Sequence, residues 1–161
     1  MKKYIPFIIF CILTLLWIGF IFANSAKSGV ESGKASSAVV EVIENILEKI
    51  GFERDVSERF VRKLAHFLEY MMLSLLICAD VTLISTNSEP IRKRRVYFAI
   101  APAFSFIIAN IDEFCVQAAT VGRGPSFKDV CIDTAGAFAG ALAFAFVIFT
   151  VSAIRNRKKL S

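Results

Sequence analysis

The residues best suited to chemistry lie between Arg62 and Tyr70, at the spacing of one helix face. His66 comes four residues after Arg62, Glu69 comes three after His66, and Tyr70 comes four after His66. All four side chains therefore fall on one side of a helix. Ionisable groups inside an apolar segment are costly and indicate function by default. Since histidine titrates near neutral pH, His66 and Glu69 are the candidate acid–base pair.

More polar residues follow further along the chain. One apolar stretch ends in four polar residues, Asn110, Asp112, Glu113 and Gln117. The start of the next stretch carries four more, Arg123, Ser126, Asp129 and Asp133. Glu113 is a third catalytic candidate. The residues expected to hold an anion are Arg62, Lys63, Tyr70, Gln117, Arg123 and Ser126. The residues expected to orient them, or to hold a hard divalent cation through oxygen atoms, are Asp112, Asp129 and Asp133.

Plainer interpretations stand beside these. His66 could be a helix-end residue hydrogen-bonded to Glu69 or Glu113, and Glu113 could form a structural ion pair with Arg123. Gly136 and Gly140 have the small-xxx-small spacing of close helix packing. Cys115 and Cys131 bracket a loop and could pair. No cofactor is evident, and no Ser or Cys stands in a recognised nucleophile motif.

Four apolar stretches must position these residues. They cover residues 5–23, 64–86, 97–115 and 130–154 of a chain that is 56% hydrophobic. About 20 apolar residues cross a bilayer, and the first stretch exceeds the core of a signal peptide, so it is expected to remain as an anchor. The sequence predicts an all-α membrane protein with four transmembrane helices in one bundle, a single domain over residues 1–161.

The segment between the first two spans predicts an amphipathic helix. Its apolar residues recur at helical spacing, at Val39, Ile43, Ile46, Leu47 and Ile50. Such a helix packs on the end of the bundle or on the membrane surface. Asp55 and Glu58 resemble a capping box, which places the next helix start near Val56. The residues 87–90 predict a turn after that helix.

The basic residues predict the topology. They are dense at the N-terminus, at residues 92–95 and at the C-terminus, which the positive-inside rule assigns to the cytoplasm. Both termini are then cytoplasmic, the amphipathic helix lies in the first extracytoplasmic loop, and the polar clusters meet in the outer leaflet. Asp80 lies nearer the cytoplasmic end. This topology accounts for many of the basic residues behind the +5 net charge, so no nucleic-acid partner is needed to explain them.

Three segments of the chain resemble the VanZ-like family of bacterial membrane proteins. Residues 22–29 (FANSAKSG) resemble the short Ser-rich segment after that family's first span, and residues 60–70 (FVRKLAHFLEY) resemble its R-K-x-A-H-F-x-E-Y motif. Residues 112–140 resemble its D-E-x-x-Q…G-R…D-V-x-x-D/N-x-x-G pattern. Here, however, Gln117 follows Glu113 by four residues instead of three, and Val121 replaces the usual Pro before Gly-Arg.

The resemblance implies a protein of the bacterial cell membrane that affects susceptibility to teicoplanin-type glycopeptides. The residues add a first hypothesis, a site that binds and could modify an anionic envelope lipid, a lipid-linked cell-wall precursor or a glycopeptide. A second is a non-catalytic scaffold whose polar layer is structural. A third is a proton-coupled transporter with Glu69, Asp80 and Asp112 as its relay.

Overall fold

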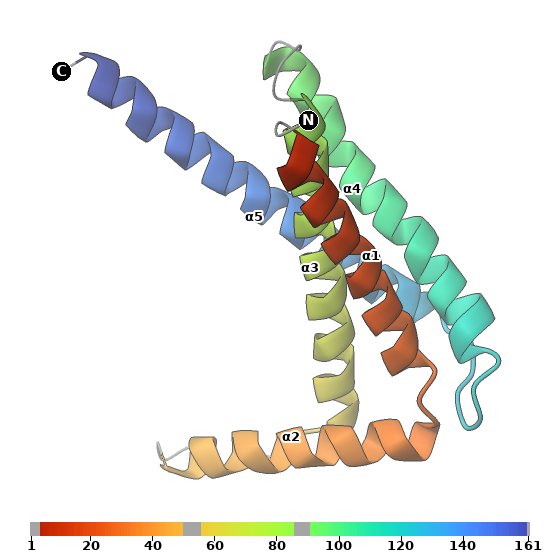
Figure 1. Cartoon of the computed structure of the whole chain (residues 1–161). Coiled ribbons are helices and arrows are strands. Elements are labelled where there is room, and N and C mark those ends of the chain that lie inside the picture. Colours follow the sequence, from red (N-terminus) through yellow and green to blue (C-terminus); the bar gives the residue numbers. More distant parts are fainter. Residues whose placement is uncertain (1–3, 50–55, 86–90, 161) are drawn as a thin grey trace.

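The computed structural model describes residues 4–49, 56–85 and 91–160, with backbone only at 85, 91–97 and 155–160. Its helices are α1 (Ile5–Ser25), α2 (Gly29–Lys49), α3 (Glu58–Ser85), α4 (Ile91–Ile111), the π-helix η2 (Asp112–Gln117) and α5 (Phe127–Leu160) (Figure 1). The described residues contain no strand, so the all-α prediction is confirmed.

Four of these helices are long and apolar enough to cross a membrane, over Ile5–Ser25, Glu58–Ile84, Phe98–Gln117 and Phe127–Ile154. The prediction of four spans is therefore confirmed. Large apolar side chains such as Leu16, Leu142 and Phe149 are 65–74% exposed, which suits helices that face lipid. The second and fourth spans begin earlier than the apolar stretches predicted at residues 64 and 130, because their helices continue into polar sequence. The start of α3 at Glu58 is within two residues of the helix start predicted near Val56.

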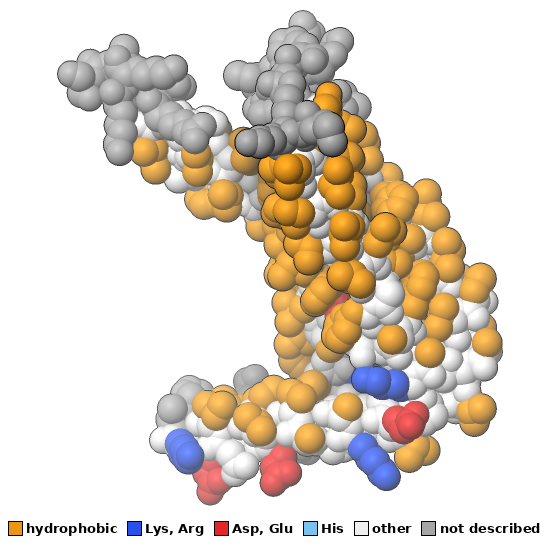
Figure 2. Space-filling model, in the orientation of Figure 1, with side chains coloured by type: hydrophobic (Ala, Val, Ile, Leu, Met, Phe, Trp, Pro, Cys, Tyr) orange, Lys and Arg blue, Asp and Glu red, His pale blue; other side chains and the backbone are white. Residues whose placement is uncertain are grey.

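The amphipathic helix α2 lies across one end of the bundle, roughly perpendicular to α3 (Figure 1). Its exposed apolar residues include Val39, Val42 and Ile46. Figure 2 shows hydrophobic side chains along the side of α2 that faces the spans, and most of its charged side chains along the opposite side. This arrangement is that of a helix lying in the membrane interface.

A capping box starts α2. The Ser28 backbone N–H and hydroxyl donate to Glu31 Oε2 at 3.0 and 2.9 Å, and Glu31 N–H donates to Ser28 Oγ at 3.3 Å. The two hydrogen bonds that Glu31 Oε2 accepts, above all the one from the Ser28 hydroxyl, lower the pKa of Glu31. The capping box predicted at Asp55 and the turn predicted at 87–90 lie outside the described residues.

Helices α3 and α5 pack closely against each other, and two glycines make this packing possible. A Cβ on Gly136 would overlap the carbonyl oxygen of Phe67, and one on Gly140 would overlap that of Met71. The neighbouring Ala137 and Ala141 are buried as well. The helix-packing role predicted for Gly136 and Gly140 agrees with this geometry.

Replacing Gly136 with Ala should destabilise the protein. The clashing atom belongs to the α3 backbone, so the two helices must separate, at a cost of about 1–3 kcal/mol. Thermal unfolding of the purified protein, followed by size-exclusion chromatography, would show a lower midpoint. Gly19→Ala is the matched control, because a Cβ there meets nothing within 4 Å. Equal midpoints for the two variants would contradict the packing role.

Candidate functional site

The polar face of α3 is held by α1. Asn24 Nδ2 donates to Glu69 Oε1 at 2.8 Å, and Trp17 Nε1 donates to the Glu69 carbonyl at 2.9 Å. Lys27 Nζ in turn donates to Asn24 Oδ1 at 2.8 Å. The Glu69 carboxyl therefore has a fixed orientation, set by residues more than forty positions earlier in the chain.

The end of α4 continues as the π-helix η2, which brings three polar side chains together. Gln117 Nε2 donates to Glu113 Oε2 at 2.6 Å and to Asp112 Oδ2 at 3.3 Å. The Ala118 N–H bonds the Glu113 carbonyl five residues back, the hydrogen bond that defines a π-turn. Ser25 Oγ of α1 donates to Asp112 Oδ2 at 2.7 Å. Asp112 and Glu113 are almost fully buried.

Glu113 also fixes the start of α5. Its Oε1 accepts the Ser126 backbone N–H at 2.7 Å, and the Ser126 carbonyl accepts N–H groups from Asp129 and Val130. A carboxylate at a helix N-terminus is favourable, because unpaired N–H groups and the positive end of the helix dipole meet there. Glu113 and Ser126 thus bond to each other and line neither of the two cavities described below.

The loop before α5 carries Arg123 to the corner between α1 and α2. Gly122 has φ +77°, a left-handed conformation that favours glycine, and Gly29 N–H donates to the Val121 carbonyl at 3.1 Å. A Cβ on Gly29 would approach the Gly122 oxygen to 2.7 Å, so both glycines permit this contact.

From this loop the Arg123 guanidinium reaches three groups. Nη1 donates to the Ser25 carbonyl at 3.0 Å and to Gln117 Oε1 at 3.3 Å, and Nη2 donates to Ser32 Oγ at 2.6 Å. Burial, and after it the positive charge of nearby Arg62, lower the pKa of Arg123. The structure shows no direct ion pair between Arg123 and Glu113; the Gln117 amide links them by accepting from one and donating to the other.

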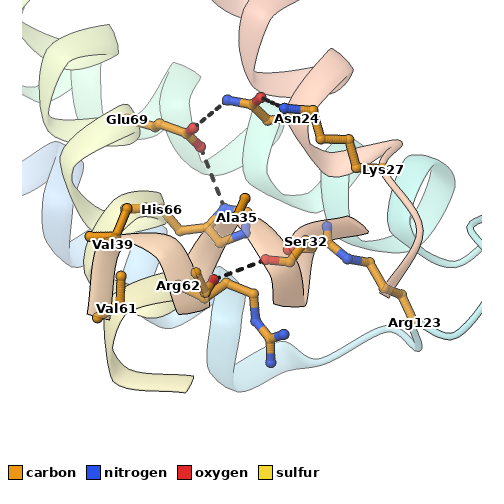
Figure 3. Close-up of a pocket in the computed structure, with 12 residues that line it drawn as sticks. Asn24, Lys27, Ser32, Ala35, Val39, Val61, Arg62, His66, Glu69 and Arg123 are labelled. Carbon is orange, nitrogen blue, oxygen red and sulfur yellow. Dashed lines mark hydrogen bonds and ion pairs between the residues drawn. The ribbon is translucent and has the colours of Figure 1, made fainter. Parts of the chain in front are cut away.

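These residues surround a first cavity of about 180 Å³ between α2, the end of α1 and the start of α3 (Figure 3). Its polar lining consists of Asn24, Lys27, Ser32, Ser36, Arg62, His66, Glu69 and Arg123. Within the described part of the chain, Arg62 has no hydrogen-bond or ion-pair partner. Two guanidinium groups thus face the same space, and one of them is free.

His66 stands between this cavity and a second one of about 270 Å³ on the α5 side. Its Nδ1 lies 3.7 Å from Glu69 Oε2 and 4.0 Å from Asp133 Oδ1, and it is buried without a hydrogen bond. Lys63 Nζ forms an ion pair with Asp129 Oδ1 at 2.9 Å beside the second cavity. The alternative bonding of His66 to Glu113 is not what the structure shows.

The remaining predicted groups are placed as follows. Tyr70 is fully buried, its hydroxyl has no partner, and it lines neither cavity. Cys115 and Cys131 are both exposed and free, so the disulfide considered from their spacing is not formed. Among the described residues no three His, Cys, Asp or Glu side chains converge as a metal site, which leaves the divalent-cation alternative without a ligand set.

Asp80 is remote from the other carboxyls of the proposed proton relay. Its Oδ2 accepts the Thr14 hydroxyl at 2.7 Å. Eleven residues of helix, about 16 Å, separate it from Glu69, and the buried Leu73 and Ile77 lie between them in sequence. This spacing gives the transporter hypothesis no continuous path.

The sequence analysis assigned no role to Trp17, Asn24, Ser25 or Ser32, although all four bond to site residues. The signal available for Asn24 and Ser25 was the FANSAKSG segment, which carried part of the family resemblance. The spacing of residues along one helix could not show which residues of the other helices Asn24 and Ser25 contact.

Comparison with known proteins adds the family. A family model described as VanZ/LLP1 matches residues 10–149, a range that includes all the site residues above. No curated protein and no solved structure matches the chain.

Proposed function

Because this chain belongs to the VanZ/LLP1 family and is a multi-pass membrane protein, we propose that its first cavity binds a phosphate group at the membrane surface. The ligand is an anionic envelope lipid or a lipid-linked cell-wall precursor of a bacterial cell membrane, held in the outer leaflet. One observation carries the proposal: Arg62 and Arg123 face the same cavity, and Arg62 is unpaired within the described residues.

Charge supports a phosphate over a neutral ligand. Each guanidinium is a rigid fork of N–H donors suited to phosphate oxygens. Placing two such groups together, partly buried, costs free energy that a bound anion would recover. Lys27 lines the same cavity and adds a third positive charge.

The position of the cavity supports a lipid-borne phosphate. One wall of the cavity is α2, with Ala35 and Val39 in the lining, and α2 directs its hydrophobic side toward the spans (Figure 2). A ligand whose head group enters beneath α2 would keep its chains beside the exposed apolar surface of the spans. Modification of the ligand is the further part of the proposal, with His66 and Glu69 as the proton-transfer pair of the same cavity.

Arg62→Gln should weaken phosphate binding without destabilising the fold. Calorimetric titration of the detergent-solubilised protein with dihexanoyl phosphatidic acid should show about tenfold weaker binding, the effect of one charge-assisted pair. The thermal midpoint should not change, because Arg62 has no described partner to lose. Arg123→Gln should weaken binding similarly but also lower the midpoint, since it breaks three hydrogen bonds.

Lys49→Gln, at the exposed end of α2, is the matched loss of one positive charge away from the cavity and should bind like wild type. In cells, wild-type protein should reduce teicoplanin susceptibility and the Arg62→Gln variant should not. Unchanged lipid affinity of Arg62→Gln would reject the phosphate site.

A structural scaffold is the second candidate function, favoured by one specific observation. Asp112, Glu113, Gln117 and Ser126 form a buried network in which most polar atoms are paired, as structural polar layers are. This network adjoins the first cavity through Arg123 but does not line it.

A further inference from the structure

Asp133 is the most isolated carboxyl of the described residues. It has zero residue exposure, and neither carboxyl oxygen has a hydrogen-bond partner. Its nearest cationic candidate, His66 Nδ1, lies 4.0 Å away, too far for a hydrogen bond. An ionised carboxyl can only accept hydrogen bonds, and a buried one without donors is costly.

Asp133 lines the second cavity, so its unpaired oxygens can meet a ligand there. The cavity holds about 270 Å³ and lies between α3 and the start of α5. Its lining shares only Arg62 and His66 with that of the first cavity. The Lys63–Asp129 pair beside it is about one-third exposed, at 35% and 32% of the two side chains.

The charges around Asp133 favour a cation. The charged groups that act on it most strongly are carboxyls, those of Asp112, Glu113 and Asp129. Arg59, Arg62 and Lys63 also line this cavity, but Lys63 pairs with Asp129, and within the described residues only His66 comes within 4.0 Å of the Asp133 carboxyl. The second cavity therefore combines a guanidinium that it shares with the first cavity, that of Arg62, with a buried carboxyl that has no hydrogen-bond donor.

We propose that the second cavity binds a primary ammonium group, with Asp133 as its acceptor. A primary ammonium carries three N–H donors and one positive charge, which supply what the two oxygens of Asp133 lack. A trimethylammonium group has the charge but no N–H donor. Combined with the proposed phosphate site, on which this part rests, the ligand class is an aminoalkyl phosphate, as a lipid headgroup or as a free compound.

The test compares two lipids that differ only in their amine. The full-length protein in detergent is titrated with dihexanoyl phosphatidylethanolamine and with dihexanoyl phosphatidylcholine. We expect the ethanolamine lipid to bind about tenfold more tightly, and Asp133→Asn to reduce this preference to less than about twofold. Asp80→Asn is the control, because Asp80 is a carboxyl of α3 bonded to Thr14 away from both cavities; it should keep the preference.

Equal affinity of the wild type for the two lipids would overturn the proposal, and this comparison needs no variant that must fold. A preference that survives in Asp133→Asn would overturn it too, as would displacement of the ethanolamine lipid by millimolar Mg²⁺, which would assign the cavity to a metal ion. The preference also appearing with acyl-free phosphoethanolamine and phosphocholine would support a soluble ligand, and its restriction to the lipids would support a headgroup.

The same titrations separate this inference from the phosphate site. If Arg62→Gln weakens both lipids but neither is preferred, only the ammonium site fails. If Arg62→Gln changes neither affinity and the amine preference persists, only the phosphate site fails.

Discussion

Alkaline phosphatase fused after Ser161 should be inactive, and the same enzyme fused after Ser37 should be active. The enzyme folds only where disulfides form, outside the cytoplasm. We expect the C-terminus to be inside because short dense basic clusters lie at residues 92–95 and 155–159. In the fold, the start of α1 and the end of α5 lie at the end of the bundle opposite α2 (Figure 1). One orientation therefore decides the side of every polar residue in the site.

Green fluorescent protein at the same two positions is the control, because it should give the opposite pattern and confirm that both fusions are made. Activity after Ser161 with inactivity after Ser37 would place α2 and both cavities on the cytoplasmic side. The phosphate ligand would then have to be sought in the inner leaflet.

Glu113→Ala should destabilise the protein by about 3 kcal/mol. The carboxylate is 1% exposed and accepts the Ser126 N–H at 2.7 Å and Gln117 Nε2 at 2.6 Å, so its removal leaves the part-buried Ser126 N–H without its acceptor and the buried Gln117 amide with only its 3.3 Å bond to Asp112. One of those donors begins α5, so the helix start should loosen first. Denaturant unfolding of the purified protein would measure the loss, with Glu48→Ala on the exposed side of α2 as the near-neutral control.

The double variant Glu113→Gln with Arg123→Gln should not recover the stability that each single change loses. Recovery is expected of two charges in direct contact, whereas here the Gln117 amide stands between them. Recovery of stability in the double variant would show that the two charges interact directly after all.

The sequence predicted the spans well because hydropathy over about 20 residues is a strong signal. The limits of an apolar stretch do not mark the ends of its helix. The backbone ladder of α3 begins at Glu58, within two residues of the helix start predicted near Val56 but six residues before the apolar stretch expected at residue 64. Hydrogen bonding fixes a helix end, and hydropathy does not report it.

Three residues that line the first cavity, Arg62, His66 and Glu69, were singled out in the sequence because one helix carries them. Contacts were missed where the partner is uncharged and lies on another helix. Asn24 and Ser25 sit at the end of an apolar run, and only the packing of α1 on α3 and η2 shows that they hold Glu69 and Asp112. An ion pair between Glu113 and Arg123 was considered for the same reason, because the sequence could not show that the Gln117 amide lies between them.

The π-helix η2 fits the one-residue difference between this chain and the D-E-x-x-Q pattern that it resembles. On an α-helix, residues five apart point about 140° away from each other, yet Asp112 and Gln117 share a hydrogen bond across that interval. A π-turn contains one more residue than an α-turn, so the longer spacing from Glu113 to Gln117 is absorbed within the turn. An extra residue taken up in this way leaves both flanking segments in register, because Gln117 bonds to Asp112 and Glu113, and Arg123 bonds to the Ser25 carbonyl. Homologues with the shorter spacing should have an ordinary α-turn here and the same contacts on either side of it.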